Sequence, residues 1–261
     1  MVMDPTLPRI SVRDLMMQAF LTGWELSDKT VSQDEYLQSS IQVIEMLQVE
    51  PENLYAEEGL GLPDGEEVLD YAICEKAKDY MPLRQLAEAI GLVRQHAAQW
   101  HILPEKIAVC GFSAGGHLAL SGAVLDIPGE AAQPRPNAVI LGYPVVTAGQ
   151  YAHRGSFVQL AGSTDPAAQQ AFGLEDKITP QTPPVFVWTT MEDATVPVEN
   201  TLMLVNALHR AGVPCEAHLF EKGVHGTSIS TAEVDQPSRH RHHWVELAVE
   251  WLEDTFAFSV C

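Results

Sequence analysis

A serine between glycines, set between an apolar stretch and a helical pattern, constrains the fold of this chain more than any other feature. The motif GFSAGGH has Ser113 as its third residue, at the centre of GFSAG. The apolar run 107–110 before it has the length of a buried strand, and the run 118–125 after it is typical of a helix. In that context G-x-S-x-G predicts a nucleophile elbow, a tight strand-to-helix turn. We expect Gly111 and Gly115 to be required, because side chains there would collide with neighbouring backbone.

Strand-like and helix-like stretches alternate through the second part of the chain. The expected strands are 107–110, 138–143, 185–190 and 215–220, and the expected helices include 83–100, 200–211 and 243–256. Alternation of this kind predicts an α/β fold, with a mainly parallel sheet and helices on both of its faces.

The first part of the chain has a different character. Residues 1–82 are more acidic than the rest, lack clear strands and show helical spacing of apolar residues over 11–20, 34–47 and 64–80. We therefore expect two parts: an acidic helical region of unknown role at 1–82, and an α/β domain of the catalytic type at 83–261.

Composition narrows the class of partner. A formal charge of −20 over 261 residues argues against binding to nucleic acid or to an anionic membrane surface. No stretch resembles a signal peptide or is long enough to span a bilayer. The four cysteines, Cys74, Cys110, Cys215 and Cys261, lack C-x-x-C spacing. This pattern favours free buried thiols in a cytoplasmic protein over disulfides or zinc, and no cofactor is indicated.

Two loops downstream of Ser113 carry the side chains that a nucleophilic serine needs. A serine hydroxyl requires a base to take its proton and an acid to hold that base. Asp193 follows the third expected strand, and His225 follows the fourth and is flanked by glycines. Both loops leave the same end of the sheet as the elbow, where such sheets place their sites. Glu192, beside Asp193, is the alternative acid.

With these residues in view, the chain from 83 to 256 resembles the acetyl-xylan-esterase-like branch of the α/β-hydrolase superfamily, whose members are carbohydrate-ester esterases. The resembling segments are 86–90, 111–117, 143–145, 193–200, 212–220 and 225–226. The resemblance implies that Ser113 is the nucleophile, Asp193 the triad acid, His225 the base and the Ala114 N–H an oxyanion donor. It also implies a small-molecule substrate, an acetyl or other short acyl ester of a sugar.

One part of the family pattern does not appear. A glycine-rich loop before the elbow normally supplies the second oxyanion donor, and Gly59–Gly61 is the nearest candidate. Without the strand that carries this loop, the strand at 107–110 would expose an apolar edge, which natural proteins avoid. We expect the acidic helical region, a second copy in a homodimer, or another partner to cover it. Val224 and Thr189 also differ from the usual glycine and histidine of the family.

Three histidine-containing segments carry weaker signals. The cluster 239–243 offers imidazoles to a metal, but its arginines repel a cation and no acid or cysteine is suitably spaced, so no metal site is expected. His117 is expected to pack or cap rather than act as a second base. The segment 153–157 is either a substrate-contacting lid or a plain surface loop.

Three functions remain in competition. The first is a serine esterase that works through an acyl-enzyme. The second is a catalytically degenerate hydrolase domain kept for binding or assembly. The third is a peptidase of the prolyl-oligopeptidase type, which shares the elbow and the triad order but for which the sequence shows no propeller-like repeats.

Overall fold

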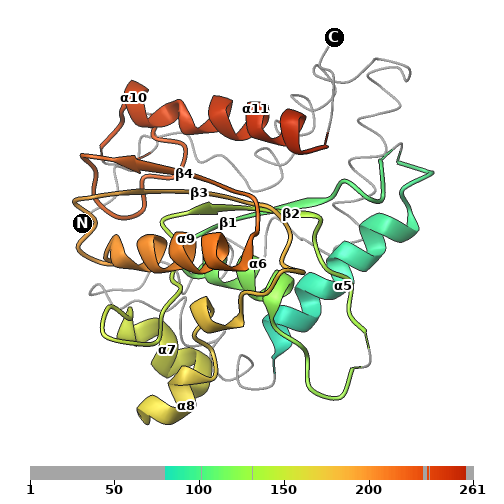
Figure 1. Cartoon of the computed structure of the whole chain (residues 1–261), viewed down its shortest axis with the longest axis horizontal. Helices are drawn as coiled ribbons and strands as arrows, with labels where there is room; N and C mark the ends of the chain where they lie inside the picture. The colour runs from blue at the N-terminus through green and yellow to red at the C-terminus, as the bar shows by residue number, and fades with distance from the viewer. Residues whose placement is uncertain (1–79, 101, 131, 232–233, 235, 257–261) are drawn as a thin grey trace, which may run out of the picture.

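The computed structural model describes residues 80–256 apart from 101, 131, 232, 233 and 235. The helices expected at 11–20 and 34–47, nearly all of that at 64–80, and Gly59–Gly61 lie outside the described residues. In chain order the elements are α5 (Met81–Gln95), β1 (Ala108–Phe112), α6 (Ala114–Val124), β2 (Ala138–Gly142), α7 (Arg154–Ala161), α8 (Pro166–Gln170), the short helix η2 (Glu175–Lys177), β3 (Val185–Thr190), α9 (Glu199–Ala211), β4 (Cys215–Phe220), α10 (Arg239–His242) and α11 (Trp244–Phe256) (Figure 1).

The described strands form a parallel sheet in the order β1-β2-β3-β4. Each strand therefore lies beside the next one in the sequence, and helices make the crossovers. Helices α6 and α9 cover one face of the sheet, with α5 outside α6, while α10 and α11 lie on the opposite side (Figure 1). This arrangement confirms the expected parallel sheet with helices on both faces.

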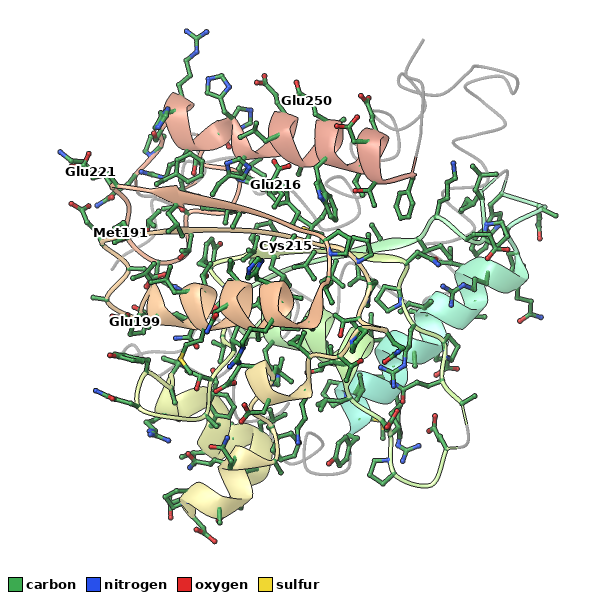
Figure 2. The ribbon with its side chains drawn as sticks, viewed as in Figure 1. Met191, Glu199, Cys215, Glu216, Glu221 and Glu250 are labelled. Carbon is green, nitrogen blue, oxygen red and sulfur yellow. The ribbon has the colours of Figure 1, made fainter. Side chains whose placement is uncertain are left out.

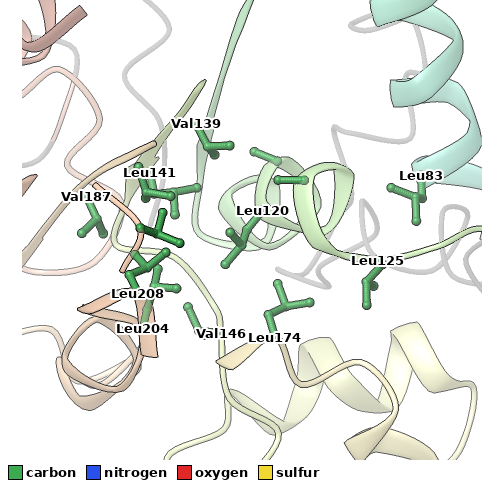
Figure 3. Packing of buried hydrophobic residues seen from close by; sticks show 14 of the residues in the cluster. Leu83, Leu120, Leu125, Val139, Leu141, Val146, Leu174, Val187, Leu204 and Leu208 are labelled. Carbon is green, nitrogen blue, oxygen red and sulfur yellow. The ribbon is translucent and has the colours of Figure 1, made fainter. Parts of the chain in front are cut away.

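The central strands are apolar throughout because both of their faces are covered. On β2, Val139 and Leu141 pack with α6 and α9, whereas Ile140 points to the opposite core. On β3, Val187 joins the first core (Figure 3) and Trp188 the second, where it stacks on Trp244 of α11 with ring centroids 5.2 Å apart. Continuous burial of β2 and β3 is what a parallel sheet between two helical layers requires.

The element boundaries agree with the sequence pattern to within a few residues, except at α5. This helix begins at Met81 and ends at Gln95, five residues before the predicted end. The chain then turns, and the buried Trp100 stacks on His96 with ring centroids 4.8 Å apart. The apolar spacing up to Trp100 thus reflects burial of a turn, not continued helix. The domain boundary at residue 83 stays a prediction.

Strand β1 is an edge strand within the described part of the chain, where it pairs with β2 alone. Its thiol, Cys110, is exposed and free, and Cys215 is partly buried and free. The expectation of a buried thiol was therefore wrong for Cys110, because this strand has a sheet neighbour on one side only among the described residues. Cys74 and Cys261 lie outside them. None of the helices between residues 80 and 256 that the structure describes has the length and apolarity needed to cross a membrane.

Candidate active site

Ser113 occupies the strained turn between β1 and α6. Its backbone angles are φ 53° and ψ −120°, a region that a residue with a side chain rarely adopts. The surrounding backbone holds this conformation: the Ser113 N–H donates to the Gly142 carbonyl at 3.0 Å, and the Ser113 carbonyl accepts from Val145 N–H at 3.1 Å. The serine side chain is therefore held at the carboxyl end of the sheet, directly before the first turn of α6.

Of the two glycines that the motif led us to expect as required, crowding demands only one, and a third glycine is also crowded. A Cβ on Gly111 would lie 2.2 Å from the Gly115 carbonyl oxygen, so this position requires glycine. A Cβ on Gly115 would meet nothing within 4 Å, and the expectation was wrong there. The close approach is at Gly116, whose Cβ would lie 2.9 Å from the Cβ of Pro144. The helix turns Gly115 toward open space and Gly116 toward the loop after β2.

Three side chains join in a hydrogen-bonded chain that starts at the serine. The Oγ of Ser113 lies 2.7 Å from Nε2 of His225, and Nδ1 of His225 lies 2.7 Å from Oδ2 of Asp193. A carboxylate only accepts, so the His225 Nδ1 carries the proton and Nε2 is free to accept from the serine hydroxyl. The Asp193 carboxylate is fully buried, and the His225 side chain is 20% exposed.

The second oxygen of Asp193 is also engaged. Its Oδ1 accepts the backbone N–H groups of Thr195 at 3.0 Å and Val196 at 2.8 Å. These donors stabilise the ionised carboxylate and fix its direction. The neighbouring Glu192 points elsewhere, to the N–H of Gly223 at 3.2 Å. Of the two candidate acids, the structure brings only Asp193 to the histidine.

The sheet topology explains why these distant residues meet. Ser113 follows β1, the Asp193 loop follows β3 and the His225 loop follows β4. In a parallel sheet all of these loops leave from the same edge. Figure 2 shows Met191 and Glu221, which directly follow β3 and β4, at one end of the sheet, with Cys215 at the start of β4 toward the other end.

The His225 loop is held by partners that the sequence did not reveal. Arg241 is buried and donates from Nη1 to the Lys222 carbonyl at 2.9 Å and from Nε to the Ser230 hydroxyl at 3.3 Å. It thereby ties the loop on both sides of His225. Arg241 belongs to the basic cluster 239–243, and its basic neighbours in the sequence give no sign that its side chain is buried.

The ring of Tyr143 packs against the ring of His225. The two rings meet edge to face, with centroids 4.9 Å apart, and the Tyr143 hydroxyl accepts the Ser228 N–H at 3.0 Å. Burial raises the pKa of the phenol above its ordinary value, which keeps it neutral. Tyr143 has φ 36°, a strained angle directly after β2. The sequence placed it in a family-like segment without indicating this contact.

A buried asparagine fixes the loops beside the site. Asn200 accepts the N–H groups of Val146 at 3.0 Å and Thr147 at 3.1 Å through its Oδ1, and its amide donates to the Tyr151 carbonyl at 2.9 Å. The loops after β2 and β3 are thus joined by one side chain. A polar residue near the start of a helix in a site-forming loop is the sequence signal for such a role.

Four other histidines take structural positions. His117 is buried and bonded to the Phe172 carbonyl and the Ser121 hydroxyl, and His153 caps α7. In the 239–243 cluster, His242 bonds to the Ile229 carbonyl and His243 to Glu246. No group of three or more His, Cys, Asp or Glu side chains that could hold a metal occurs in the described part of the chain. Thr189 is buried, and Val224 is exposed on the His225 loop.

An apolar cavity of about 320 Å³ begins beside the elbow. It lies between α5, α6 and α7, and its wall includes Ala114, the residue after the serine. Ala114 is the first residue of α6, so its N–H has no partner within the helix. This N–H is the donor expected for an oxyanion, and Ala114 itself lines the cavity.

This parallel sheet covered by helices, with a serine elbow bonded to histidine and aspartate, defines an α/β hydrolase. The acetyl-xylan-esterase-like resemblance is confirmed by the relatives described next. The sequence profile of the prolyl oligopeptidase family matches residues 75–258, and the chain belongs to that family.

Two curated relatives come from bacteria. The endo-1,4-beta-xylanase B of Butyrivibrio fibrisolvens is 36% identical over 166 residues, covering 58% of this chain and 25% of the relative. The acetylxylan esterase of Xylanibacter ruminicola is 29% identical over 157 residues, covering 58% of this chain and 32% of the relative. The matched segments therefore span between a quarter and a third of the length of these relatives.

Solved structures give the same picture. The acetyl ester-xyloside bifunctional hydrolase from Caldicellulosiruptor lactoaceticus is 34% identical, with a TM-score of 0.60, over 69% of this chain and 67% of that one. A carboxylesterase from Lactobacillus plantarum is 30% identical, with a TM-score of 0.58, over 68% of each chain. Both share the fold described above.

Proposed function

We propose that the chain is a serine ester hydrolase that cleaves short acyl esters, of the acetyl type and borne on carbohydrates, through an acyl-enzyme. The observation that carries the proposal is the hydrogen-bonded chain from Ser113 through His225 to Asp193. The xylan-related and ester-related names of its relatives support the choice of substrate.

In the proposed reaction Nε2 of His225 takes the proton of Ser113 as the serine oxygen bonds to the acyl carbon. His225 then gives this proton to the alcohol oxygen as the carbon–oxygen bond of the ester breaks. Water, deprotonated by His225, then attacks the acyl carbon, the bond from this carbon to Ser113 Oγ breaks, and His225 returns the proton to Oγ as the acid leaves. The buried Asp193 carboxylate stabilises the histidine cation that forms in each step.

The developing oxyanion requires donors, and the Ala114 N–H is the one expected among the described residues. A second donor, which in related folds comes from a glycine-rich loop, is expected from outside the described residues or from another chain. Loss of one such donor costs about 10²–10³ in rate. The rate of the full chain therefore depends on how this second donor is supplied.

The test compares hydrolysis of p-nitrophenyl acetate and of acetylated xylo-oligosaccharides by wild type and Ser113→Ala. We expect the substitution to lower kcat by about 10⁴-fold or more. Asp193→Asn should lower kcat by about 10²–10⁴-fold, because the histidine loses the partner that fixes its proton. Glu192→Gln is the matched control, since the amide oxygen still accepts from Gly223, and its rate should stay within about twofold of wild type.

Equal rates for wild type and Ser113→Ala would refute the esterase. A large effect of Glu192→Gln with a small effect of Asp193→Asn would refute the assignment of the acid.

A catalytically degenerate domain is the second candidate, and the observation that favours it is the edge position of β1 in the described part of the chain. A fluorophosphonate probe separates the two candidates, because it reports nucleophilicity at Ser113 without requiring the natural substrate. Strong labelling that Ser113→Ala abolishes supports the enzyme, and absent labelling supports the degenerate domain.

The name of the prolyl oligopeptidase family suggests a third candidate function, the hydrolysis of peptide bonds. A proline p-nitroanilide, assayed beside the acetate ester, tests this third function. We expect the ester to be preferred, as the names of the relatives indicate.

A further inference from the structure

The cavity beside the elbow is larger than an acetyl group needs. Its volume is about 320 Å³, whereas an acetyl methyl occupies roughly the share of one water molecule, about 30 Å³. Pockets that enclose a drug-sized molecule begin at about 300 Å³. A substrate with only an acetyl group would leave most of this space unused.

The wall of the cavity is uncharged. Its apolar members come from three helices and the loops beside them: Pro82, Leu83, Ala114, Leu118, Leu125, Val145, Phe157, Leu160 and Phe172. The described lining residues include no Asp, Glu, Lys or Arg. His117, the one ionisable base in the wall, is held neutral because burial lowers its pKa to about 4.

Five side chains of the described wall are polar, namely Tyr80, His117, Ser121, Ser156 and Gln159, and three of them form hydrogen bonds within the protein. His117 bonds to the Phe172 carbonyl at 2.9 Å and to the Ser121 hydroxyl at 3.2 Å. Ser156 bonds through its hydroxyl to His153 at 2.9 Å. Tyr80 and Gln159 supply the other polar groups, and the remaining wall is apolar, so most of the surface that faces a ligand favours hydrocarbon over a sugar.

The position of the cavity selects which half of an ester enters it. The leaving alcohol must accept its proton from His225, so it lies on the side of the β4 loop. Neither Ser113 nor any residue of the His225 loop is among the described lining residues, which reach the elbow at Ala114 and Gly115 and otherwise come from α5, α6, α7 and adjacent loops. The group that remains bonded to Ser113, next to Ala114, is the acyl group.

We infer that this cavity is an acyl-chain site that takes linear or branched hydrocarbon acyl groups of about four to eight carbons. The inference rests on the proposed ester hydrolysis at Ser113 and adds a preference that the acetyl-named relatives do not carry. Each methylene that enters the cavity gains about 0.8 kcal/mol at full burial, which corresponds to roughly a fourfold rise in kcat/KM.

The experiment measures kcat/KM of the full-length chain on p-nitrophenyl acetate, butyrate, hexanoate and octanoate. We expect at least a tenfold rise from acetate to hexanoate. A second series varies the alcohol at constant acetyl, with methyl, butyl and hexyl acetate followed by acid release, and should be nearly flat. A rise in the alcohol series with a flat acyl series would overturn the acyl assignment.

Two substitutions that reduce the cavity test its role. A Cβ on Gly115 meets open space, so Gly115→Val projects into the cavity without a backbone clash. Leu160→Trp narrows it from the α7 wall. Each should lower the hexanoate-to-acetate ratio of kcat/KM by tenfold or more. Leu202→Trp is the matched control, because Leu202 lies exposed on α9 away from the cavity, and its ratio should equal that of wild type.

The outcomes separate this inference from the proposed function. Hydrolysis of acetate with a flat or falling acyl series, or an unchanged ratio in both cavity variants, would overturn the acyl-chain site and leave the esterase standing. Absence of hydrolysis for every ester, together with absent fluorophosphonate labelling at Ser113, would overturn both.

Discussion

His117 is a buried base that remains uncharged in the folded chain. Its Nε2 donates to the Phe172 carbonyl, which can only accept, and its Nδ1 accepts from the Ser121 hydroxyl. Burial lowers its pKa from 6.5 to about 4, although the Phe172 carbonyl partly opposes this by favouring the cation. A proton on Nδ1 would reverse the bond, so that the serine hydroxyl accepts, and would place a charge among aromatic and aliphatic side chains.

This environment predicts a pH-dependent stability. Between pH 6.5 and 4 the unfolded chain binds a proton at His117 and the native chain does not, so the stabilisation is present above pH 6.5 and is lost as pH falls. The loss amounts to at most about 3 kcal/mol. Urea unfolding at pH 7, 6 and 5 should show a smaller fall for His117→Gln than for wild type. A stability difference between the two proteins that stays constant with pH would contradict this.

Residue identities near the serine could be read from the sequence where the chemistry is specific. Ser113, Asp193 and His225 follow from the elbow motif and from the loops after the third and fourth strands. Arg241 and Tyr143 could not be read in this way. Their contacts depend on where the fold places α10 and the loop after β2 relative to the His225 loop, and no local sequence pattern predicts this placement.

At the scale of elements, the elbow helix α6 is positioned by a close approach to the loop after β2. The Gly116 Cα lies where any side chain would press on Pro144, and the Val145 N–H bonds to the carbonyl of Ser113. Helix and loop therefore hold each other, and the strained serine depends on both. Gly115, one residue earlier, contributes nothing to this contact.

The two glycines should respond in opposite directions to alanine. Gly116→Ala places a methyl 2.9 Å from Pro144 and should destabilise the fold by roughly 1–3 kcal/mol, because the packed loop must move. Gly115→Ala adds a methyl in open space within a helix and should stabilise by up to about 1 kcal/mol. Chemical denaturation of both variants measures the difference. Equal effects of the two substitutions would show that the contact with Pro144 does not matter.

Elements with strong apolar periodicity were predictable, and those defined by tertiary contacts were not. Strands β3 and β4 have the predicted bounds: β3 is an apolar run introduced by two prolines, and β4 alternates apolar with polar residues before Glu221. The early end of α5 and the short α7 and α8 were not predicted. Helix α8 has only five residues and begins with an Asp165 cap and a proline, a signal too short to stand out.

At the scale of the whole molecule, the edge of β1 that has no partner among the described strands bears on how the chain assembles. The expectation from sequence is that the acidic N-terminal region or a second copy covers it. The exposed thiol of Cys110, in the middle of this strand, reports on such a cover. A thiol that is covered reacts slowly with iodoacetamide, and how its rate depends on protein concentration identifies the cover.

We expect Cys110 in the full chain to react at least tenfold more slowly than in the urea-unfolded chain, as measured by mass spectrometry of the labelled peptide. Protection that rises with concentration, with a sedimenting species of twice the 28.6 kDa chain mass, indicates a homodimer. Protection independent of concentration indicates burial within the chain, in keeping with the pKa of Cys110, which burial raises to about 11. Cys110→Ser identifies the labelled peptide, and labelling as fast as in the unfolded chain at every concentration would refute the expected cover.

The sheet order also bears on how the site comes into existence during synthesis. Because each strand lies beside its predecessor, successive strand–helix units add to a growing edge as the chain leaves the ribosome. The serine emerges early, with β1, whereas the histidine follows β4 and is tied down by Arg241 of α10 near the end of the chain. In the proposed mechanism, Ser113 therefore becomes a nucleophile only after the last crossover docks, and nascent or truncated chains carry this serine without its base.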